Sequence, residues 1–370
     1  MRVGFVCREY PAIDPHHGGV GAAVETLARS LVEAGHRVRV FAIGERDETI
    51  ENGEVEVRCL PYSGVLTTAL RVRRLLRSEL ASGELDVIET SEAEAHLLPG
   101  GPGSVVRMNG SHHFWCAHLD QQRRWGRLAL EQWGVRRAGG LCAVSSFAGE
   151  ETRRLMRLGT RPIEVLPNPI DTGFFHPDPK SVQPGRVVFV GTVTPKKGVL
   201  ELCLAFEALR GEQPEAELRL LGRDDGPPGD CTRDRILEAL SDWGRERIQF
   251  LGAQSRDVVA IEMRRAQLCA FPSYMETQGI VVGEALASGR PAVAASVGPG
   301  PETLGQPPAG WTAGPQDVPA LAVVLSRALE NPRLCDELGA RGRHHIEKNY
   351  SSESLLERTL RFYQSHSATS

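Results

Sequence analysis

Long hydrophobic runs, paired cysteines and a large net charge are all missing from this 370-residue sequence. The longest apolar runs are strand-sized, about five to seven residues, so we expect no membrane-spanning helix and no signal peptide at the start. The eight cysteines include no CxxC pair, which argues against a zinc site or a disulfide framework and favours free thiols in a reducing cytosol. A formal net charge of −4 gives no general reason to expect nucleic-acid binding.

Strand-like apolar runs alternate with amphipathic helical segments along nearly the whole chain, and the alternation begins again in the second half. Near-continuous Val, Ile and Leu runs separated by helices are typical of parallel strands buried on both faces. The pattern therefore predicts two consecutive doubly wound, Rossmann-like α/β units. The expected strands are 2–7, 38–43, 55–60, 85–89, 105–108, 141–144, 163–166, 187–190, 217–221, 248–251, 268–271 and 291–295, and the clearest helical patterns are 19–34, 68–80, 120–138, 147–158 and 352–363.

A polar stretch rich in proline separates the two halves. Five prolines between residues 167 and 184 rule out a continuous helix there, as expected of an interdomain linker. We expect an N-terminal domain at 1–178, a C-terminal domain at 179–348 and a final helical segment at 349–370. A second loop-rich stretch, 298–315, precedes three C-terminal helical patterns.

Open α/β sheets bind ligands beyond the carboxyl ends of their strands, so the residues after each strand are the first candidates for a site. Gly18 and Gly19 open a helix after the first strand. Glycines there let a ligand approach the backbone and leave N–H groups that favour an anion. They do not follow the strand directly, as in GxGxxG, and a flexible loop is an equally good interpretation of them alone.

Lysine is scarce, because only four of the 43 basic residues are lysines, yet two of the four are adjacent. Lys196 and Lys197 follow Gly191 and Thr192 in the loop after strand 187–190 and precede a helix. A lysine beyond a strand and just before a helix is well placed to meet a phosphate. A solvated loop charge is the alternative, and it fits Lys196 better than Lys197.

The segment 268–287 contains two glutamates in a strand, loop and helix pattern. Glu276 is expected in the loop over the strand end, and Glu284 in the first turns of a helix that begins near Gly279. The N–H groups at the helix start offer a phosphate site between them. Carboxylates repel phosphate, so these two are better suited to accept hydrogen bonds from hydroxyls on either side of it. A nucleotide sugar has this layout of ribose hydroxyls, diphosphate and sugar hydroxyls.

The same segment resembles the E-x7-E signature of retaining glycosyltransferases with the GT-B fold, specifically glycosyltransferase family 4. The resemblance extends over essentially the whole chain, and it implies two Rossmann-like domains facing a cleft. The N-terminal domain would bind the acceptor, the C-terminal domain would bind the nucleotide sugar, and the final helix would cross back onto the first domain. The other similar stretches are 18–38, 163–175, 284–294 and 298–302.

The resemblance also implies roles for single residues. Gly19 would lie near the donor's phosphate or sugar, and Lys197 would neutralise the diphosphate as it leaves. Glu276 would hold hydroxyls of the donor sugar, and Glu284 would hold the ribose. The other expected donor contacts are Gly18, Gly191, Thr192, Lys196, Leu251, Ala253, Gly279, Ile280 and Val281.

Two positions depart from the family's pattern. Thr192 stands where many members carry an arginine, so one of two positive charges on the diphosphate is missing; Lys196 or Arg223 could compensate. Asn109 stands where a histidine is frequent, and an amide cannot titrate near neutrality. His112 or His113 could take over, with a packing role equally open for both. The expected catalytic residues are therefore Glu276, Lys197, Asn109 and His112.

The implied reaction is retaining transfer of a hexosyl unit from a UDP- or GDP-sugar to a hydroxyl of a small-molecule, lipid-linked or glycan acceptor. A double displacement needs a carboxylate nucleophile, and Glu92 and Glu94 are candidates only because they lie near a strand end. The family's favoured route is a front-face reaction in which the departing diphosphate helps to deprotonate the acceptor. No Asp-x-Asp motif is present, so we expect no metal and no cofactor besides the donor as co-substrate.

Two alternatives remain from the sequence: a catalytically weak or silent GT-B homologue that binds nucleotide sugar, and a GT-B sugar epimerase. Basic patches at 71–77 and 123–137 could bind an anionic membrane surface or a phosphorylated acceptor, although a solvated helix face is the better interpretation of each. We expect a cytoplasmic protein with at most peripheral contact to the inner membrane face, and no nucleic-acid partner.

Overall fold

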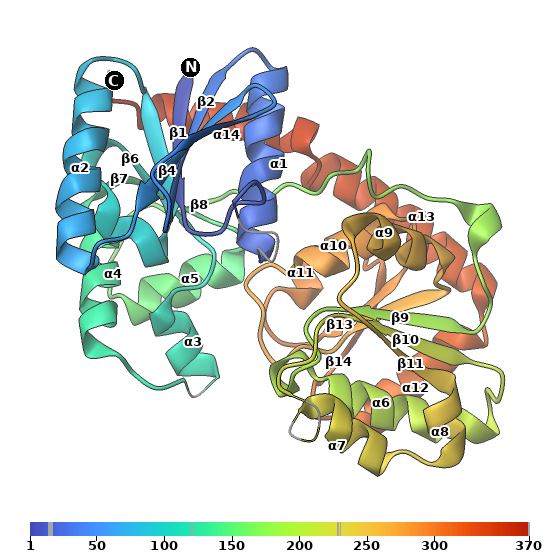
Figure 1. The fold of residues 1–370 in the computed structure, drawn as a ribbon. Coiled ribbons are helices and arrows are strands. Elements are labelled where there is room, and N and C mark those ends of the chain that lie inside the picture. The colour runs from blue at the N-terminus through green and yellow to red at the C-terminus, as the bar shows by residue number, and fades with distance from the viewer. Residues whose placement is uncertain (14–17, 120, 228, 230, 369–370) are drawn as a thin grey trace. The chain divides into compact units, whose positions relative to one another are not determined.

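The computed structural model describes residues 1–13, 18–119, 121–227, 229 and 231–368, and the chain folds into two compact units (Figure 1). The N-terminal unit consists of Met1–Pro169 together with Ser352–Ser370, and the C-terminal unit consists of Ile170–Ser351. The first division lies inside the predicted proline-rich linker, some residues before the expected boundary at 178. The last segment, Ser352–Ser370, belongs to the N-terminal unit.

The N-terminal unit contains an eight-stranded sheet in the order β3-β4-β2-β1-β5-β6-β7-β8. Neighbouring strands are parallel except β3 and β4, which are antiparallel. The strand order reverses between β1 and β5, and open α/β sheets bind ligands at such a switch point. The strands are β1 (Arg2–Cys7), β2 (Arg37–Gly44), β3 (Thr49–Asn52), β4 (Val55–Pro61), β5 (Val87–Ser91), β6 (Gly101–Met108), β7 (Ala138–Ala143) and β8 (Glu164–Val165).

Helices cover both faces of this sheet (Figure 1). The alternating side chains of its strands enter two separate cores. Phe5 packs in one core with Leu31 and Phe362, whereas Val6 packs in the other with Val72. This alternation is what the apolar strand runs predicted. The helices are α1 (Gly19–Glu33), α2 (Val65–Ala81), η1 (Glu92–Leu97), α3 (His112–His118), α4 (Trp125–Arg137), α5 (Ser146–Leu155) and α14 (Ser352–Ser365).

The C-terminal unit contains a six-stranded parallel sheet in the order β11-β10-β9-β12-β13-β14. This is the 3-2-1-4-5-6 order of the Rossmann fold, with its switch point between β9 and β12. The strands are β9 (Arg186–Val190), β10 (Glu217–Leu221), β11 (Ile248–Gly252), β12 (Leu268–Phe271), β13 (Ala292–Ala295) and β14 (Gly310–Ala313). The helices are η2 (Pro179–Ser181), η3 (Pro195–Lys197), α6 (Val199–Glu207), η4 (Ala208–Gly211), α7 (Thr232–Ala239), α8 (Asp242–Arg247), α9 (Arg256–Arg265), α10 (Ile280–Ala287), α11 (Gly300–Leu304), α12 (Val318–Leu329) and α13 (Pro332–Asn349).

Several short elements were missing from the sequence-based expectation, among them β3, β14 and α3. β3 is a polar edge strand without apolar alternation, and β14 lies in the stretch expected to be loop, where it pairs with β13 alone. α3 precedes α4, and α4 begins at Trp125 rather than near 120. Short edge strands and helices of one or two turns contain too few residues to show a clear periodic pattern in the sequence.

The eight cysteines are all buried and free, which confirms the expectation of free thiols. Within the part of the chain that the structure describes, no helix is both long enough and apolar enough to cross a membrane.

Candidate active site

Two loops meet at the switch point of the C-terminal sheet. One connects β9 to α6, and the other connects β12 to α10. Gly198 brings them into contact: its φ is 65°, and a Cβ atom there would lie 2.1 Å from the carbonyl oxygen of Pro272. The backbone N–H of Tyr274 also donates to the carbonyl oxygen of Lys196 at 2.9 Å. The two loops are therefore fixed to each other through their backbones.

This contact places Lys197 beside Glu276. The Nζ atom of Lys197 forms an ion pair with Oε1 of Glu276, and about a quarter of each side chain remains exposed. Lys196, by contrast, is exposed on the loop surface. The structure thus brings together Lys197, expected to contact the diphosphate, and Glu276, expected to contact sugar hydroxyls. Lys196 lies apart from this pair.

Helix α10 begins just beyond Glu276. Gly279, at its N-cap, has a φ of 75°, which is the left-handed conformation that glycine adopts at low cost. The first N–H groups of a helix have no acceptor within the helix, so those of Ile280 and Val281 favour an anion. Glu276, Gly279 and Val281 also line a hollow of about 20 Å³ at this point.

Glu284 lies in the second turn of α10 and is half-buried. Loss of hydration raises the pKa of its carboxyl to about 7, and the charge of Arg256 opposes that rise. A carboxyl in such a position gains from hydroxyl donors, because their hydrogen bonds replace the lost water.

The remaining expected donor contacts lie at the ends of β9, β10 and β11. A Cβ atom at Gly222 would lie 1.8 Å from the carbonyl oxygen of Gly191, and the N–H of Gly222 donates to the carbonyl of Gly252 at 2.9 Å. Thr192 follows Gly191 and is half-buried, while Leu251 and Ala253 flank Gly252. Close backbone packing therefore gathers these positions at the same edge of the sheet.

A cavity of about 370 Å³ lies at the switch point of the N-terminal sheet. Its size falls near the lower end of the roughly 300–1,000 Å³ that is typical of small-molecule sites. Val20 of α1 contributes to its wall, whereas Gly18 and Gly19 do not line it. The polar and aromatic residues that line it include Arg8, Glu9, Glu89, Thr90, Ser91, Glu92, Glu94, Arg107, Asn109, Trp115, Arg127 and Asn168.

Asn109 lines this cavity in the loop after β6, and its amide is oriented by two hydrogen bonds. Its Oδ1 accepts from the amide of Asn168 at 2.9 Å, and its Nδ2 donates to the carbonyl of Arg107 at 3.2 Å. The buried Glu92 carboxylate accepts from the N–H groups of Asn109 and Gly110 at 2.8 and 3.0 Å. Burial raises the pKa of Glu92 to about 7. Both oxygens of the Glu92 carboxylate accept hydrogen bonds from backbone N–H groups, as expected of a residue that positions the loop.

Two family models together match most of the chain. Residues 17–174 match the model described as Glycosyltransferase Family 4, and residues 184–331 match the model described as Glycosyl transferases group 1. The chain is a group 1 glycosyltransferase. It is therefore an enzyme of the GT-B fold that transfers a sugar from a nucleotide-sugar donor.

Named relatives of this glycosyltransferase match over nearly their whole length. An MMP α-(1→4)-mannosyltransferase of Mycolicibacterium hassiacum is 26% identical over 405 residues, covering 94% of this chain and 95% of that protein. A GDP-mannose-dependent α-(1-6)-phosphatidylinositol monomannoside mannosyltransferase of Mycolicibacterium smegmatis is 28% identical over 377 residues, covering 94% of each.

Solved structures match the fold of the glycosyltransferase over the whole chain. Sucrose-phosphate synthase of Thermosynechococcus elongatus superposes with a TM-score of 0.80 at 21% identity, covering 99% of this chain and 98% of that one. HepE of Anabaena, solved in complex with UDP and glucose, superposes with a TM-score of 0.76 at 17% identity and covers 99% and 100%.

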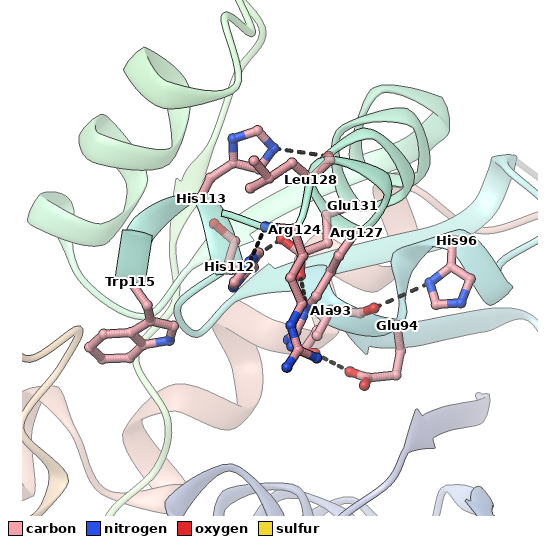
Figure 2. Close-up of polar contacts among 12 residues, drawn as sticks. Ala93, Glu94, His96, His112, His113, Trp115, Arg124, Arg127, Leu128 and Glu131 are labelled. Carbon is pink, nitrogen blue, oxygen red and sulfur yellow. Dashed lines mark hydrogen bonds and ion pairs between the residues drawn. The ribbon is translucent and has the colours of Figure 1, made fainter. Parts of the chain in front are cut away.

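The two histidines after Asn109 are the first residues of α3, and their rings contact the segment that leads into α4 and α4 itself (Figure 2). Nε2 of the buried His112 accepts from the N–H of Arg124 at 3.2 Å, and the ring of His113 hydrogen-bonds the carbonyl of Leu128 at 2.9 Å. The carboxylate of Glu131 accepts the backbone N–H of His112 at 2.9 Å. Burial lowers the pKa of His112. His112 does not line the cavity, and its catalytic role stays a prediction.

Sequence reasoning missed a buried ion pair at the cavity floor. Nε of Arg107 lies 2.7 Å from Oε1 of Glu89, and the hydroxyl of Tyr363 in α14 donates to Oε2 of Glu89 at 2.8 Å. Although burial disfavours the charged guanidinium, the Glu89 carboxylate holds the pKa of Arg107 above its usual value. The sequence does contain one hint of this pair, because β5 and β6 are apolar strands that each contain one charged residue.

Among the described residues of the glycosyltransferase, no group of three or more His, Cys, Asp or Glu side chains is arranged to hold a metal ion.

Proposed function

We propose that this glycosyltransferase moves a hexosyl unit from a UDP- or GDP-sugar to an acceptor hydroxyl with retention of anomeric configuration and without a metal ion. The observation that carries the proposal is the Lys197–Glu276 pair at the start of α10. A cation, a helix N-terminus and a carboxylate in one place match a diphosphate that is bonded to a sugar.

Each part of the donor would contact a different group of these residues. The diphosphate would lie between Lys197 and the N–H groups of Ile280 and Val281, where it competes with Glu276 for the lysine. Glu276 is then left to accept hydrogen bonds from hydroxyls of the transferred sugar. Glu284, in the second turn of α10, would accept hydrogen bonds from the ribose hydroxyls. The base would border the backbone at Leu251 and Ala253, with Gly191 and Thr192 at the other edge. Lys196, exposed on the loop surface, would lie outside the donor site.

Both candidate nucleophiles of the N-terminal unit are engaged in other contacts. Glu92 holds two backbone N–H groups, and Glu94 accepts from the Ser91 hydroxyl and pairs with Arg8. These contacts favour a front-face transfer over a double displacement. The bond from the anomeric carbon to the diphosphate breaks, the acceptor oxygen bonds to the same face, and its proton passes to a diphosphate oxygen. Lys197 stabilises the charge that develops on that leaving group.

The names of relatives and structural neighbours support both donor classes. One relative is named as GDP-mannose-dependent, and one neighbouring structure contains UDP and glucose. A silent homologue that only binds nucleotide sugar is the second candidate, because Thr192 and Asn109 depart from the family's pattern. A sugar epimerase is the third, and it would release no glycosylated product.

Peripheral membrane contact is a further part of the proposal. Leu66 and Leu70, one turn apart on α2, are 74% and 68% exposed, and Arg71, Arg74 and Arg77 are exposed on the same helix. Apolar and basic side chains on one helix suit an anionic lipid surface, such as the inner face of a membrane. Sedimentation with vesicles tests this: Leu70→Asp should weaken binding to anionic vesicles, and binding unaffected by lipid charge would contradict it.

The donor site is tested by thermal shifts with UDP-, GDP-, ADP- and dTDP-sugars, with and without magnesium. A donor at about one hundred times its Kd should add roughly 2.7 kcal/mol of stability. We expect a shift with a UDP- or GDP-sugar that does not depend on magnesium and is lost in Lys197→Ala. No shift with any donor, or a shift only with magnesium, would contradict the proposal. Transferred product that is lost in Glu276→Ala separates an active enzyme from a silent homologue.

A further inference from the structure

The cavity of the N-terminal unit has two unlike walls. One wall is apolar and comes from one side of α1, with Val20, Ala23 and Val24. The other is polar and comes from the loops after β5 and β6, with Glu94 and Asn109. Such an amphipathic cavity suits a compact molecule with an apolar face and a polar edge. The charges of the polar side narrow the choice of molecule further.

The first cation at the cavity, Arg8, is already paired. Its Nε lies 3.4 Å from Oε1 of Glu94, whose side chain is only 13% exposed. Burial raises the pKa of Glu94, while the hydrogen bond from Ser91 and the nearby arginine charges oppose that rise. An anion that approached Arg8 would therefore meet the Glu94 carboxylate at the same place.

The other two cations that line the cavity are also paired. Nε of Arg127 lies 3.0 Å from Oε1 of the buried Glu131, as Figure 2 shows. Arg107 is held by Glu89 at the cavity floor and donates to the carbonyl of Leu166 as well. Among the described lining residues, each arginine thus has a carboxylate of this chain as its partner.

Besides the three arginines, the start of α1 is a fourth feature that attracts anions, and it too is paired with a carboxylate. Oε2 of Glu9 accepts the backbone N–H of Gly18 at 3.0 Å, at the N-cap of the helix. The positive end of the helix dipole therefore already faces a negative charge. A phosphate at this point would be repelled by Glu9.

From this pairing we infer that the molecule bound in the N-terminal cavity is an uncharged, hydroxyl-rich ring, and that phosphate- or carboxylate-bearing acceptors are excluded by Glu9 and Glu94. The inference rests on the proposed function, because it names the class of acceptor for the same transfer. A neutral saccharide satisfies both walls: its C–H face packs on Val20 and Val24, and its hydroxyls donate to Glu94 and accept from Arg8 and Asn109. Trp115 adds an aromatic surface at the rim.

The test uses pairs of saccharides that differ only by a phosphate. The enzyme is mixed with the donor that gave the thermal shift, and nucleoside diphosphate release is measured with glucose, mannose and their methyl glycosides, and with glucose 6-phosphate and mannose 6-phosphate. We expect the neutral sugars to accelerate release at least about 100-fold more than the phosphates, since placing like charges together costs several kcal/mol. Equal or better use of the phosphates, or no use of any neutral sugar, would overturn the inference.

Variants show whether the carboxylates set this preference. Glu94→Gln frees Arg8 and should narrow the preference for neutral over phosphorylated sugar by about tenfold. Glu9→Gln should act in the same direction, and it does not alter a buried residue. Glu33→Gln, the same change at an exposed site at the other end of α1, is the control and should leave the ratio unchanged. An unchanged ratio in both Glu94→Gln and Glu9→Gln would overturn the assigned role of these carboxylates.

The outcomes separate the inference from the function on which it rests. A protein that binds and slowly hydrolyses its donor but accepts only phosphorylated sugars keeps the proposed function and loses the inference. A protein that binds no donor at all loses the proposed function, and the inference falls with it.

Discussion

The two sheets have the same strand order around their switch points, but the two switch points carry opposite features. In the C-terminal unit, Lys197 and the start of α10 attract an anion, and the hollow beside them is only about 20 Å³. In the N-terminal unit the cavity is about 370 Å³. Carboxylates of the chain already pair with the arginines that line it and accept a hydrogen bond at the start of α1. The topology decides where each unit binds a ligand, and the loop residues decide which ligand.

The largest effect is expected from breaking the buried pair beneath the N-terminal cavity. Arg107→Met leaves the Glu89 carboxylate buried and unpaired, which should cost about 3–5 kcal/mol of unfolding free energy. Urea unfolding should show the loss in the transition of the N-terminal unit. Arg46→Met removes an exposed pair with Glu48 and serves as the control, with an expected change of at most about 1 kcal/mol. Equal losses in the two variants would contradict this account.

The corresponding change in the C-terminal unit acts on catalysis and leaves the fold largely intact. Lys197→Ala removes the cation that stabilises the leaving diphosphate, and kcat/KM should fall about 100- to 1,000-fold. Lys196→Ala, next to it in the chain but exposed, should change kcat/KM by less than about threefold. Steady-state kinetics measure both, and a larger loss for Lys196→Ala would show that the wrong lysine has been assigned.

The pH dependence compares one carboxyl from each unit. Burial raises the pKa of both Glu284 and Glu92 to about 7 from an unfolded value near 4.5, so the folded protein binds more protons than the unfolded chain. Stability should therefore fall as the pH rises from about 4.5 to 7, and stay lower above 7. Glu284→Gln and Glu92→Gln should each flatten this slope in urea melts at several pH values.

The donor should distinguish these two carboxyls. Ribose hydroxyls stabilise the ionised form of Glu284, so saturating donor should flatten the part of the slope that Glu284→Gln removes. The part that Glu92→Gln removes should persist, because Glu92 holds the backbone of its own unit. If the donor instead flattened the part of the pH slope that Glu92→Gln removes, the nucleotide would bind in the N-terminal unit, contrary to the proposal.

The smallest effect is expected from a matched pair of tyrosines. Tyr363→Phe removes a hydrogen bond to Glu89 in the N-terminal unit, and Tyr274→Phe removes one of 2.7 Å to Glu201 in the C-terminal unit. Each should cost about 0.5–1.5 kcal/mol, or somewhat more because the acceptor is charged. Each loss should appear in the transition of its own unit, and a crossed result would contradict the division of the chain into these units.

Periodic apolar runs were sufficient to predict the two parallel sheets. β12 begins and ends at the residues expected from the sequence, because it is a short apolar run that is buried throughout. β3 escaped detection because its Thr-Ile-Glu-Asn sequence has no apolar alternation. The closeness of Lys197 and Glu276 could also be predicted, because both lie in loops that follow strands and strand ends converge in a parallel sheet.

The N-terminal site was far less predictable. Glu92, Glu131 and Glu9 accept hydrogen bonds from backbone N–H groups of other segments, and the linear sequence does not reveal such partners. Tyr363 reaches Glu89 across 274 positions of sequence. His112 was a candidate because it follows Asn109. Only the structure shows that its ring accepts a hydrogen bond from the backbone N–H of Arg124, and its catalytic role stays a prediction. Contacts of this kind can be recognised only in the folded structure.

The place of α14 in the N-terminal unit has a consequence for the order in which the protein is made. Phe362 and Tyr363 complete a core that Phe5 begins, so the first unit to be synthesised cannot finish folding until the last helix has left the ribosome. The C-terminal unit is continuous in sequence and has all its strands and helices earlier. Folding during translation should therefore run against the direction of synthesis. A circular permutant that joins residues 352–370 ahead of Met1 would restore the ordinary order, in which the first domain to emerge folds first.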